Sequence, residues 1–352
     1  MLSTDLRSYL VCVLIVILAA VGSAQTTFPA LSDAQLHHLL DHANKGKIPD
    51  QMNLGVRYQY GFSVPRDLAQ AEFWLRRAAT SGNPPAQVQL GLLYLQPEML
   101  PEHGSDALRW FMRAVAGGQH EAEFNVALIY LRGLGTPANP AQAEHWLRKA
   151  DGHKVQRAKA VLGVLLLDSP DPARQHEGFE LLKQASAQGD PDGGNALAYC
   201  YEFGIGTAPD LPAALRLYET AANAGDPDAM HSLSMMYYEG KGVPQDFKRA
   251  FDWSQRGCEA GDSAACWSVG TLYAKGEGVP RDVVRGYAYL GVANGNAQAL
   301  AGMSSSLTAE QMEQASAISQ KWNASHAVRL SSLPVYADRA PTQLVTQSAA
   351  GK

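Results

Sequence analysis

Three cysteines lie outside the N-terminal apolar run of this 352-residue chain. Their positions allow a specific chemical prediction, namely which of them can form a disulfide. Cys258 falls at the end of one predicted helix, and Cys266 begins the next, eight residues on, across the turn at Gly261-Asp262. Two antiparallel helices joined by a short turn bring such positions together, so we expect a disulfide in an oxidising compartment. The alternative is two buried free thiols. Cys200 has no partner and is expected to be a buried, inert thiol.

Two histidines are spaced for metal binding. His38 and His42 are four residues apart in a predicted N-terminal helix, so their rings share one face. Imidazole nitrogens at this spacing bind transition metals when further ligands complete the site. The sequence places no third ligand beside them, and the plainer interpretation is a pair of solvated histidines. We therefore predict no metal site, no cofactor and no catalytic residue.

Gly-x-Gly units recur at residues 133–135, 204–206, 240–242 and 276–278 and superficially resemble phosphate-binding loops. A nucleotide-binding loop must follow a strand and open a helix, whereas these units follow predicted helices. We interpret them as helix terminators, because glycine readily takes the left-handed conformation at a helix C-terminus. The chain also lacks a nucleophile elbow, a Walker motif, an HExxH motif and a paired-carboxylate constellation. Enzymatic activity is therefore not expected.

One unit of about 36 residues organises the chain. A pair formed by Leu or Val and a small residue recurs seven times, and an aromatic residue follows four positions later in six copies. The pairs begin at Leu54, Leu90, Val126, Leu162, Leu197, Leu233 and Val269, with steps of 36, 36, 36, 35, 36 and 36 residues. A period of this length, kept over seven copies, is typical of a stacked helical solenoid.

The clearest copy, residues 229–262, predicts a helix, a short loop, a second helix and a short turn. The apolar residues of its first segment are spaced by four, three and one, which makes a single helical stripe. Asp246 is placed to cap the second helix, and Gly261 to end it. The small residue of each pair should let a neighbouring helix approach closely.

The full pattern A-x-x-x-L-G-x-x-Y-x-x-G-x-G-V-x-x-D-x-x-x-A-x-x-W-x-x-x-A-x-x-G resembles the Sel-one-like repeat (SLR) family, which is related to the tetratricopeptide repeats. The resemblance covers roughly residues 51–298. It implies an all-α fold, an α/α solenoid wound as a right-handed superhelix, with about seven 36-residue helix-turn-helix repeats and capping helices. It also implies a protein that binds another protein or a peptide segment.

The cysteine spacing is similar to that of the cysteine-rich secreted branch of the SLR family, in which a bridge joins adjacent helices at this turn. That resemblance also raises an alternative function, a β-lactamase-like or penicillin/peptidoglycan-binding protein. The chain has no Ser-x-x-Lys motif and no metal triad. The leading hypothesis is therefore an interaction scaffold, with a role in envelope signalling or assembly implied by the family.

The N-terminus indicates export. Residues 1–24 predict a signal peptide, because Arg7 precedes an apolar run of 13 residues and small residues at 22–24 offer a cleavage site. The run is too short for a transmembrane helix, which needs ~20 residues. We expect a periplasmic or secreted protein that does not contact the membrane after cleavage. The alternative is an uncleaved anchor.

The rest of the chain is predicted to contain four parts. These are a capping helix in residues 25–50, a solenoid of seven repeats in 51–299, a closing helix in 300–324 and a disordered tail in 325–352. We expect the closing helix to run from about Thr308 to Ala324. The net charge is −5, from 29 Lys+Arg and 34 Asp+Glu, and there is no basic run, so nucleic-acid binding is not expected.

The first helices of a solenoid usually form its binding surface. With tetratricopeptide geometry as a guide, the predicted partner-binding (concave) face is unusually apolar and aromatic. It consists of Met52, Val56, Val88, Leu92, Leu95, Phe124, Leu128, Leu131, Tyr199, Met235, Tyr238 and Trp267. Exposed apolar surface of this kind marks an interaction site. The alternative is that tight curvature or the tail buries these side chains.

Copy four departs most from the repeat. It is one residue short, has Leu166 in place of the aromatic residue, and turns at residues 168–172 with the sequence DSPDP. We therefore predict a weaker point near residues 168–175 and a firmer C-terminal half, where the Cys258–Cys266 bridge is expected.

Overall fold

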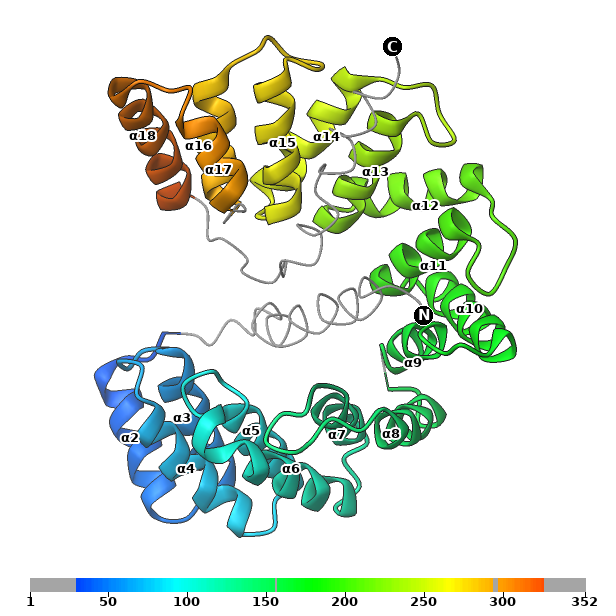
Figure 1. The fold of residues 1–352 in the computed structure, drawn as a ribbon. Helices are drawn as coiled ribbons and strands as arrows, with labels where there is room; N and C mark the ends of the chain where they lie inside the picture. Colours follow the sequence, from blue (N-terminus) through cyan, green and yellow to red (C-terminus); the bar gives the residue numbers. More distant parts are fainter. Residues whose placement is uncertain (1–29, 156, 294–296, 326–352) are drawn as a thin grey trace. The chain divides into compact units, whose positions relative to one another are not determined.

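The computed structural model describes residues 30–155, 157–293 and 297–325, and all regular secondary structure within these ranges is helical (Figure 1). The all-α solenoid of helix-turn-helix repeats is confirmed. The predicted signal peptide at 1–24 lies outside the described residues, as does the predicted tail at 325–352 apart from residue 325, which is helical. In the described part of the chain, no helix is long and apolar enough to cross a membrane.

The helices follow one another in pairs, with one helix before the first pair and two after the last. In order they are α2 (Asp33–Asn44), α3 (Ile48–Tyr60), α4 (Leu68–Thr80), α5 (Pro84–Tyr94), α6 (Leu100–Ala116), α7 (Glu121–Arg132), α8 (Pro140–Gly152), α9 (Ala158–Leu167), α10 (Pro172–Ala187), α11 (Pro191–Phe203), α12 (Leu211–Asn223), α13 (Pro227–Glu239), α14 (Phe247–Glu259), α15 (Ser263–Lys275), α16 (Val283–Val292), α17 (Ala297–Ser304) and α18 (Ala309–Ser325).

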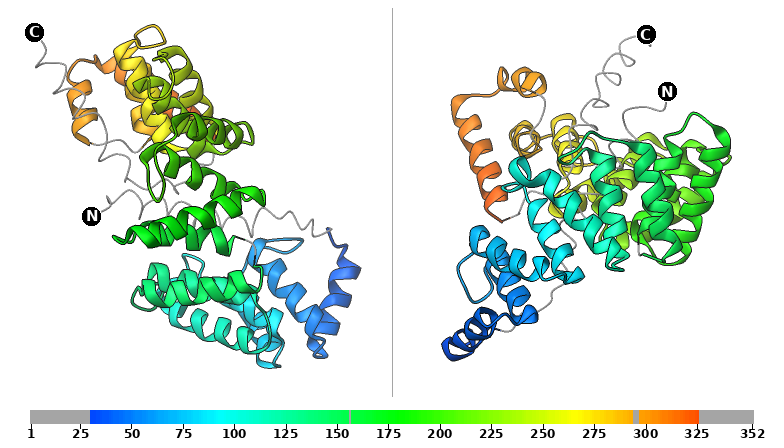
Figure 2. Two further views of the ribbon diagram at one scale, coloured as in Figure 1. Left: turned by 90° about the vertical axis from the view of Figure 1, so that its right-hand side faces the viewer. Right: turned by 90° about the horizontal axis from the view of Figure 1, so that it is seen from below.

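The chain divides into two compact units within α9, one ending at Leu162 and the other beginning at Gly163. In the first unit, α3 packs on α4, α5 on α6 and α7 on α8, and α3 also contacts α5. In the second unit, α11 packs on α12, α13 on α14 and α15 on α16, and α13 also contacts α15. Figure 2 shows the succession of helix pairs from two further sides. In each unit, one pair of first helices from neighbouring repeats therefore touches directly, α3 with α5 and α13 with α15.

The small residue of each pair lies where the two helices of a repeat meet. A Cβ atom added at Gly91 would lie only 2.7 Å from Cζ of Phe111. In the sixth repeat, where the pair ends in Ser234, the serine Oγ donates a hydrogen bond to the Ala250 carbonyl oxygen at 2.8 Å. The predicted close approach of helices at these positions is confirmed.

The Gly-x-Gly units end helices and also join repeats. Gly276 ends α15 in the left-handed conformation, with a φ of 77°, as predicted. Gly278 has a φ of 72°, and a Cβ atom there would lie 2.1 Å from the carbonyl oxygen of Phe247, at the start of the preceding repeat's second helix. A Cβ atom added at Gly206 would likewise lie only 2.3 Å from the carbonyl oxygen of Gln175. The second glycine thus makes a contact between repeats that we did not predict.

Helices α2 and α18 flank the repeats. A capping box between Ser32 and Gln35 begins α2, and the apolar side of α2 packs against Leu54 of the first repeat. Helix α18 contacts α16, where Ser319 Oγ donates to the Ala288 carbonyl oxygen at 2.9 Å. Each end of the described repeats is therefore covered by a helix.

The fourth repeat compensates for its unusual turn with side-chain hydrogen bonds. Asp171 caps α10 by accepting a hydrogen bond from the Ala173 amide at 2.9 Å. Gln175 Nε2 donates to the Ser169 carbonyl oxygen at 2.8 Å. The lower stability of residues 168–175 stays a prediction.

Gly278→Ala should lower the free energy of unfolding by about 3 kcal/mol, because it combines an unfavourable positive φ with a clash against the Phe247 backbone. Gly225→Ala is the matched control: Gly225 has a φ of 96°, but nothing lies within 4 Å of an added Cβ. The control should lose about 1 kcal/mol. Urea unfolding measures both. Equal losses would show that the contact between repeats contributes nothing.

Candidate functional site

A disulfide joins the sixth repeat to the seventh. The Cα atoms of Cys258 in α14 and Cys266 in α15 are 4.5 Å apart, and both side chains are buried. The bridge ties the last turn of one helix to the first turn of the next, as the spacing favoured. Cys200 is a buried free thiol in α11. Burial raises the pKa of Cys200 to about 12, so the thiol stays protonated and unreactive near neutral pH.

No residue of the predicted partner-binding face is fully exposed. Leu95, Phe124 and Leu128 are buried, with at most 7% of their surface accessible, and the other nine residues are half-buried. Those that pack against the buried cluster of the first unit include Met52, Val88 and Leu92. Among the described residues, the exposed large apolar side chains are instead Tyr60, Phe62, Phe73, Met112, Phe203 and Met312. The face is thus a packed surface with accessible edges.

In the second unit, this face carries aromatic rings with paired charges between them. Lys241 Nζ lies 2.8 Å from Glu202 Oε1 and 4.0 Å from the ring centroid of Phe203. Lys275 Nζ donates to Tyr238 Oη at 2.7 Å. The hydrogen-bonded residues in these two pairs are 39 and 37 positions apart, close to one repeat. The sequence analysis did not predict these two contacts. The signal for them is the repeat period, because residues about one period apart lie on equivalent helices of neighbouring repeats.

Two carboxyl groups, the half-buried Asp228 and the buried Asp262, lie at the N-terminal ends of α13 and α15. Asp262 is 5% exposed and accepts the amide hydrogen bond of Ala265 that caps α15. Burial and the neighbouring Asp262 carboxylate raise the pKa of Asp228 well above its usual range. The raised pKa of Asp228 favours its protonated form, which can donate a hydrogen bond to the Asp262 carboxylate. Burial lowers the pKa of His231 nearby, which favours a neutral imidazole.

The two histidines considered as metal ligands lie together on α2. The ring centroids of His38 and His42 are 3.9 Å apart, and His42 Nδ1 is 3.4 Å from Asp50 Oδ2. Among the described residues, three potential ligand side chains converge at a different place, formed by residues 120, 123 and 153.

One protein family matches most of the chain. The profile of the Sel1 (Sel-one-like) repeat matches seven segments, residues 49–83, 84–119, 120–150, 158–190, 195–226, 227–262 and 263–293. The chain belongs to the Sel1 repeat family. Sel1 repeat proteins are helical scaffolds for protein–protein interaction and are generally not enzymes.

Solved structures of bacterial Sel1 repeat proteins are similar to this chain. A Sel1 repeat protein from Oxalobacter formigenes is 30% identical, with a TM-score of 0.60 over 76% of this chain and 78% of that one. The protein c5321, a protective antigen present in uropathogenic Escherichia coli strains, is 24% identical, with a TM-score of 0.48 over 87% of this chain and 73% of that one. No curated protein matches this chain.

Reduction of the Cys258–Cys266 disulfide should lower the thermal midpoint of this Sel1 repeat protein by roughly 5–10 °C. By closing a short loop, the disulfide stabilises the folded state by roughly 2–3 kcal/mol in the chain-entropy model. Each kcal/mol shifts the thermal midpoint of a unit of this size by about 2–4 °C. Calorimetry with and without a phosphine reductant measures the change. The double variant Cys258→Ala/Cys266→Ala should not respond to reductant. An unchanged midpoint in the fully reduced wild type would contradict the prediction.

Asp228→Asn should become more stable relative to the wild type as the pH rises from 4 to 8. The raised pKa of Asp228 means that the folded state holds this proton more tightly than the unfolded state. The protonated Asp228 therefore stabilises the folded state fully at pH values below the pKa that Asp228 has in the unfolded chain. This stabilisation is lost as the pH rises through the higher pKa that Asp228 has in the folded protein. Thermal midpoints at several pH values measure the difference. Asp252→Asn, which removes an exposed carboxylate of α14, controls for the loss of one charge. A pH-independent difference for Asp228→Asn would contradict the prediction.

Proposed function

We propose that this Sel1 repeat protein is an exported scaffold that binds an apolar or aromatic segment of a partner protein on the surface of its first helices. The observation that carries the proposal is the composition of the predicted face in the second unit. Tyr199, Tyr238 and Trp267 there are half-buried and so keep part of their surface accessible. Aromatic side chains of this kind dominate the binding energy of protein interfaces.

The charges of this surface favour the same kind of partner. Lys241 is paired with Glu202, and Lys275 lies 3.7 Å from Glu277, so each cation has an acid beside it. A surface with neutralised charges and accessible rings binds an apolar segment at lower desolvation cost than a charged one.

Two observations support export to the periplasm or the medium. The Cys258–Cys266 disulfide is of a kind that persists in oxidising compartments. The apolar run within residues 1–24 has the length of a signal peptide core and not of a membrane span. By the family resemblance, the scaffold acts in envelope signalling or assembly and leaves the membrane once the signal is cleaved.

The test is affinity purification of the tagged full-length protein from the cell envelope and the medium, with quantitative mass spectrometry. The double variant Leu92→Glu/Tyr199→Glu should reduce recovery of a specific partner at least about tenfold, because each carboxylate places a charge in the apolar contact. The mature chain should be recovered outside the cytoplasm without residues 1–24.

The matched control is Phe73→Glu/Met112→Glu, which changes exposed apolar side chains on the second helices α4 and α6. It should recover the partner as the wild type does, and circular dichroism should show that both double variants are folded. Unchanged recovery with a folded Leu92→Glu/Tyr199→Glu protein would refute the proposed face. A bait found only in the cytoplasm, with its N-terminus intact, would refute export.

A further inference from the structure

Two consecutive turns of the first unit depart from the capping pattern of the other repeats. At four of the six turns between repeats, a glycine with positive φ is followed by an Asn or Asp that caps the next helix, at 82–83, 189–190, 225–226 and 261–262. The turn before α7 instead ends in His120, which makes no side-chain cap. The turn after α8 has His153, followed by Lys154 at a φ of 59°. Capping therefore explains neither histidine.

Glu123 also departs from the repeat, because the first two repeats have glutamine at this position. The buried Gln51 donates through Nε2 to the carbonyl oxygen of Ala43 at 3.0 Å. Gln87 donates to the carbonyl oxygen of Ala79 in the same way, at 3.3 Å. The Glu123 carboxylate cannot donate such a bond, yet it is only 1% exposed. A buried carboxylate needs a cationic partner, so this position has exchanged a structural hydrogen bond for a site of negative charge.

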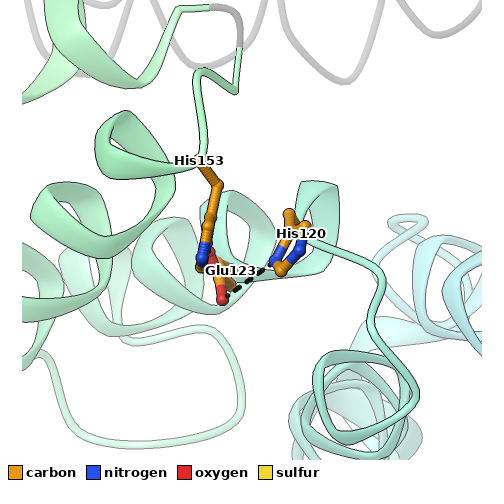
Figure 3. A group of neighbouring side chains, drawn as sticks. All are labelled: His120, Glu123 and His153. Atoms are coloured by element: carbon orange, nitrogen blue, oxygen red, sulfur yellow. Dashed lines mark hydrogen bonds and ion pairs between the residues drawn. The ribbon is translucent and has the colours of Figure 1, made fainter.

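Side chains from both unusual turns converge on this carboxylate (Figure 3). His153 Nδ1 lies 2.7 Å from Glu123 Oε2, and His120 Nδ1 lies 3.5 Å from Glu123 Oε1. The two imidazole rings stack with centroids 3.7 Å apart. One potential ligand atom of each residue lies within 4.8 Å of the others. Lys149 Nζ, 3.1 Å from Glu123 Oε1, also balances the charge.

We propose that His120, Glu123 and His153 form a zinc-binding site. Two imidazole nitrogens and one carboxylate oxygen are a common zinc ligand set, with bonds of about 2.0–2.2 Å. Tetrahedral coordination at these lengths separates the ligand atoms by about 3.4 Å, so small side-chain rotations complete the site. The Lys149 side chain is 40% exposed and turns into solvent when the metal takes its place.

The exposure of the histidines determines what kind of zinc site this is. Their side chains are 48% and 37% exposed, so the fourth coordination position opens towards the surface. Three protein ligands with an open fourth position can accept water or a side chain of a partner protein. Because zinc binds the neutral imidazole, affinity should fall as the pH drops and the histidines become protonated.

The test is calorimetric titration of zinc into the metal-free full-length protein, prepared without a polyhistidine tag. The wild type should bind one zinc ion per chain, and cobalt in its place should give the visible absorption of a four-coordinate site. His120→Gln and His153→Gln should each weaken binding more than about 10-fold, the loss that even an outer-shell partner can cause. Glu123→Gln should also lose zinc, and its fold should persist because glutamine is the residue of the first two repeats.

Two controls should keep the wild-type affinity. His145→Gln removes an exposed histidine of α8 in the same repeat, and His38→Gln/His42→Gln removes the histidine pair of α2. If the wild type binds no zinc, the three residues form an ion-pair network with Lys149 and the proposal is wrong. If all the variants bind like the wild type, zinc binds elsewhere and the proposal is equally wrong.

Discussion

The structure depends on close contacts at glycines, where a side chain would not fit. Within a repeat, Gly91 lets the ring of Phe111 press against its helix. Between repeats, Gly278 lets a loop touch the backbone at Phe247. Both contacts are short enough to exclude even a methyl group, so the helices have little freedom to shift. The repeats that carry these glycines are therefore held closely against their neighbours.

The repeat period decides which side chains of neighbouring repeats meet. Residues about one period apart, such as Lys275 and Tyr238, come within hydrogen-bonding distance because their helices are equivalent. The same rule brings Asp262, at the start of α15, against Asp228, at the start of α13. A cap that serves its own helix thus also forms a polar contact with the previous repeat. In a solenoid, a substitution in one repeat therefore also changes the contacts of the neighbouring repeat.

Departures from the repeat are the informative positions in such a chain. Where Gln51 and Gln87 serve the fold alone, Glu123 introduces a buried charge, and two turns supply histidines to it. The proposed zinc site lies wholly in the first unit, whereas the disulfide and the aromatic part of the proposed binding face belong to the second. The two proposals therefore rest on separate residues and can fail independently.

The sequence by itself determined the local structure. Periodicity and capping residues predicted a capping helix within residues 25–50 and a closing helix at about Thr308–Ala324; α2 lies within the first range, and α18 is within one residue of the second. Helix stripes, caps and glycine terminators act over a few residues, so they can be read directly from the chain. The spacing of Cys258 and Cys266 is equally local, because one short turn separates them.

Only the tertiary structure decided what the solenoid buries and what it brings together. It buried Leu95, Phe124 and Leu128, which were predicted to line an open face, and it gave the second glycine of each Gly-x-Gly unit a contact between repeats. It also placed His153 against Glu123, 30 residues away. These outcomes depend on how far each helix pair turns relative to the next, and the balance of many packing contacts sets that rotation. No short segment of sequence encodes it.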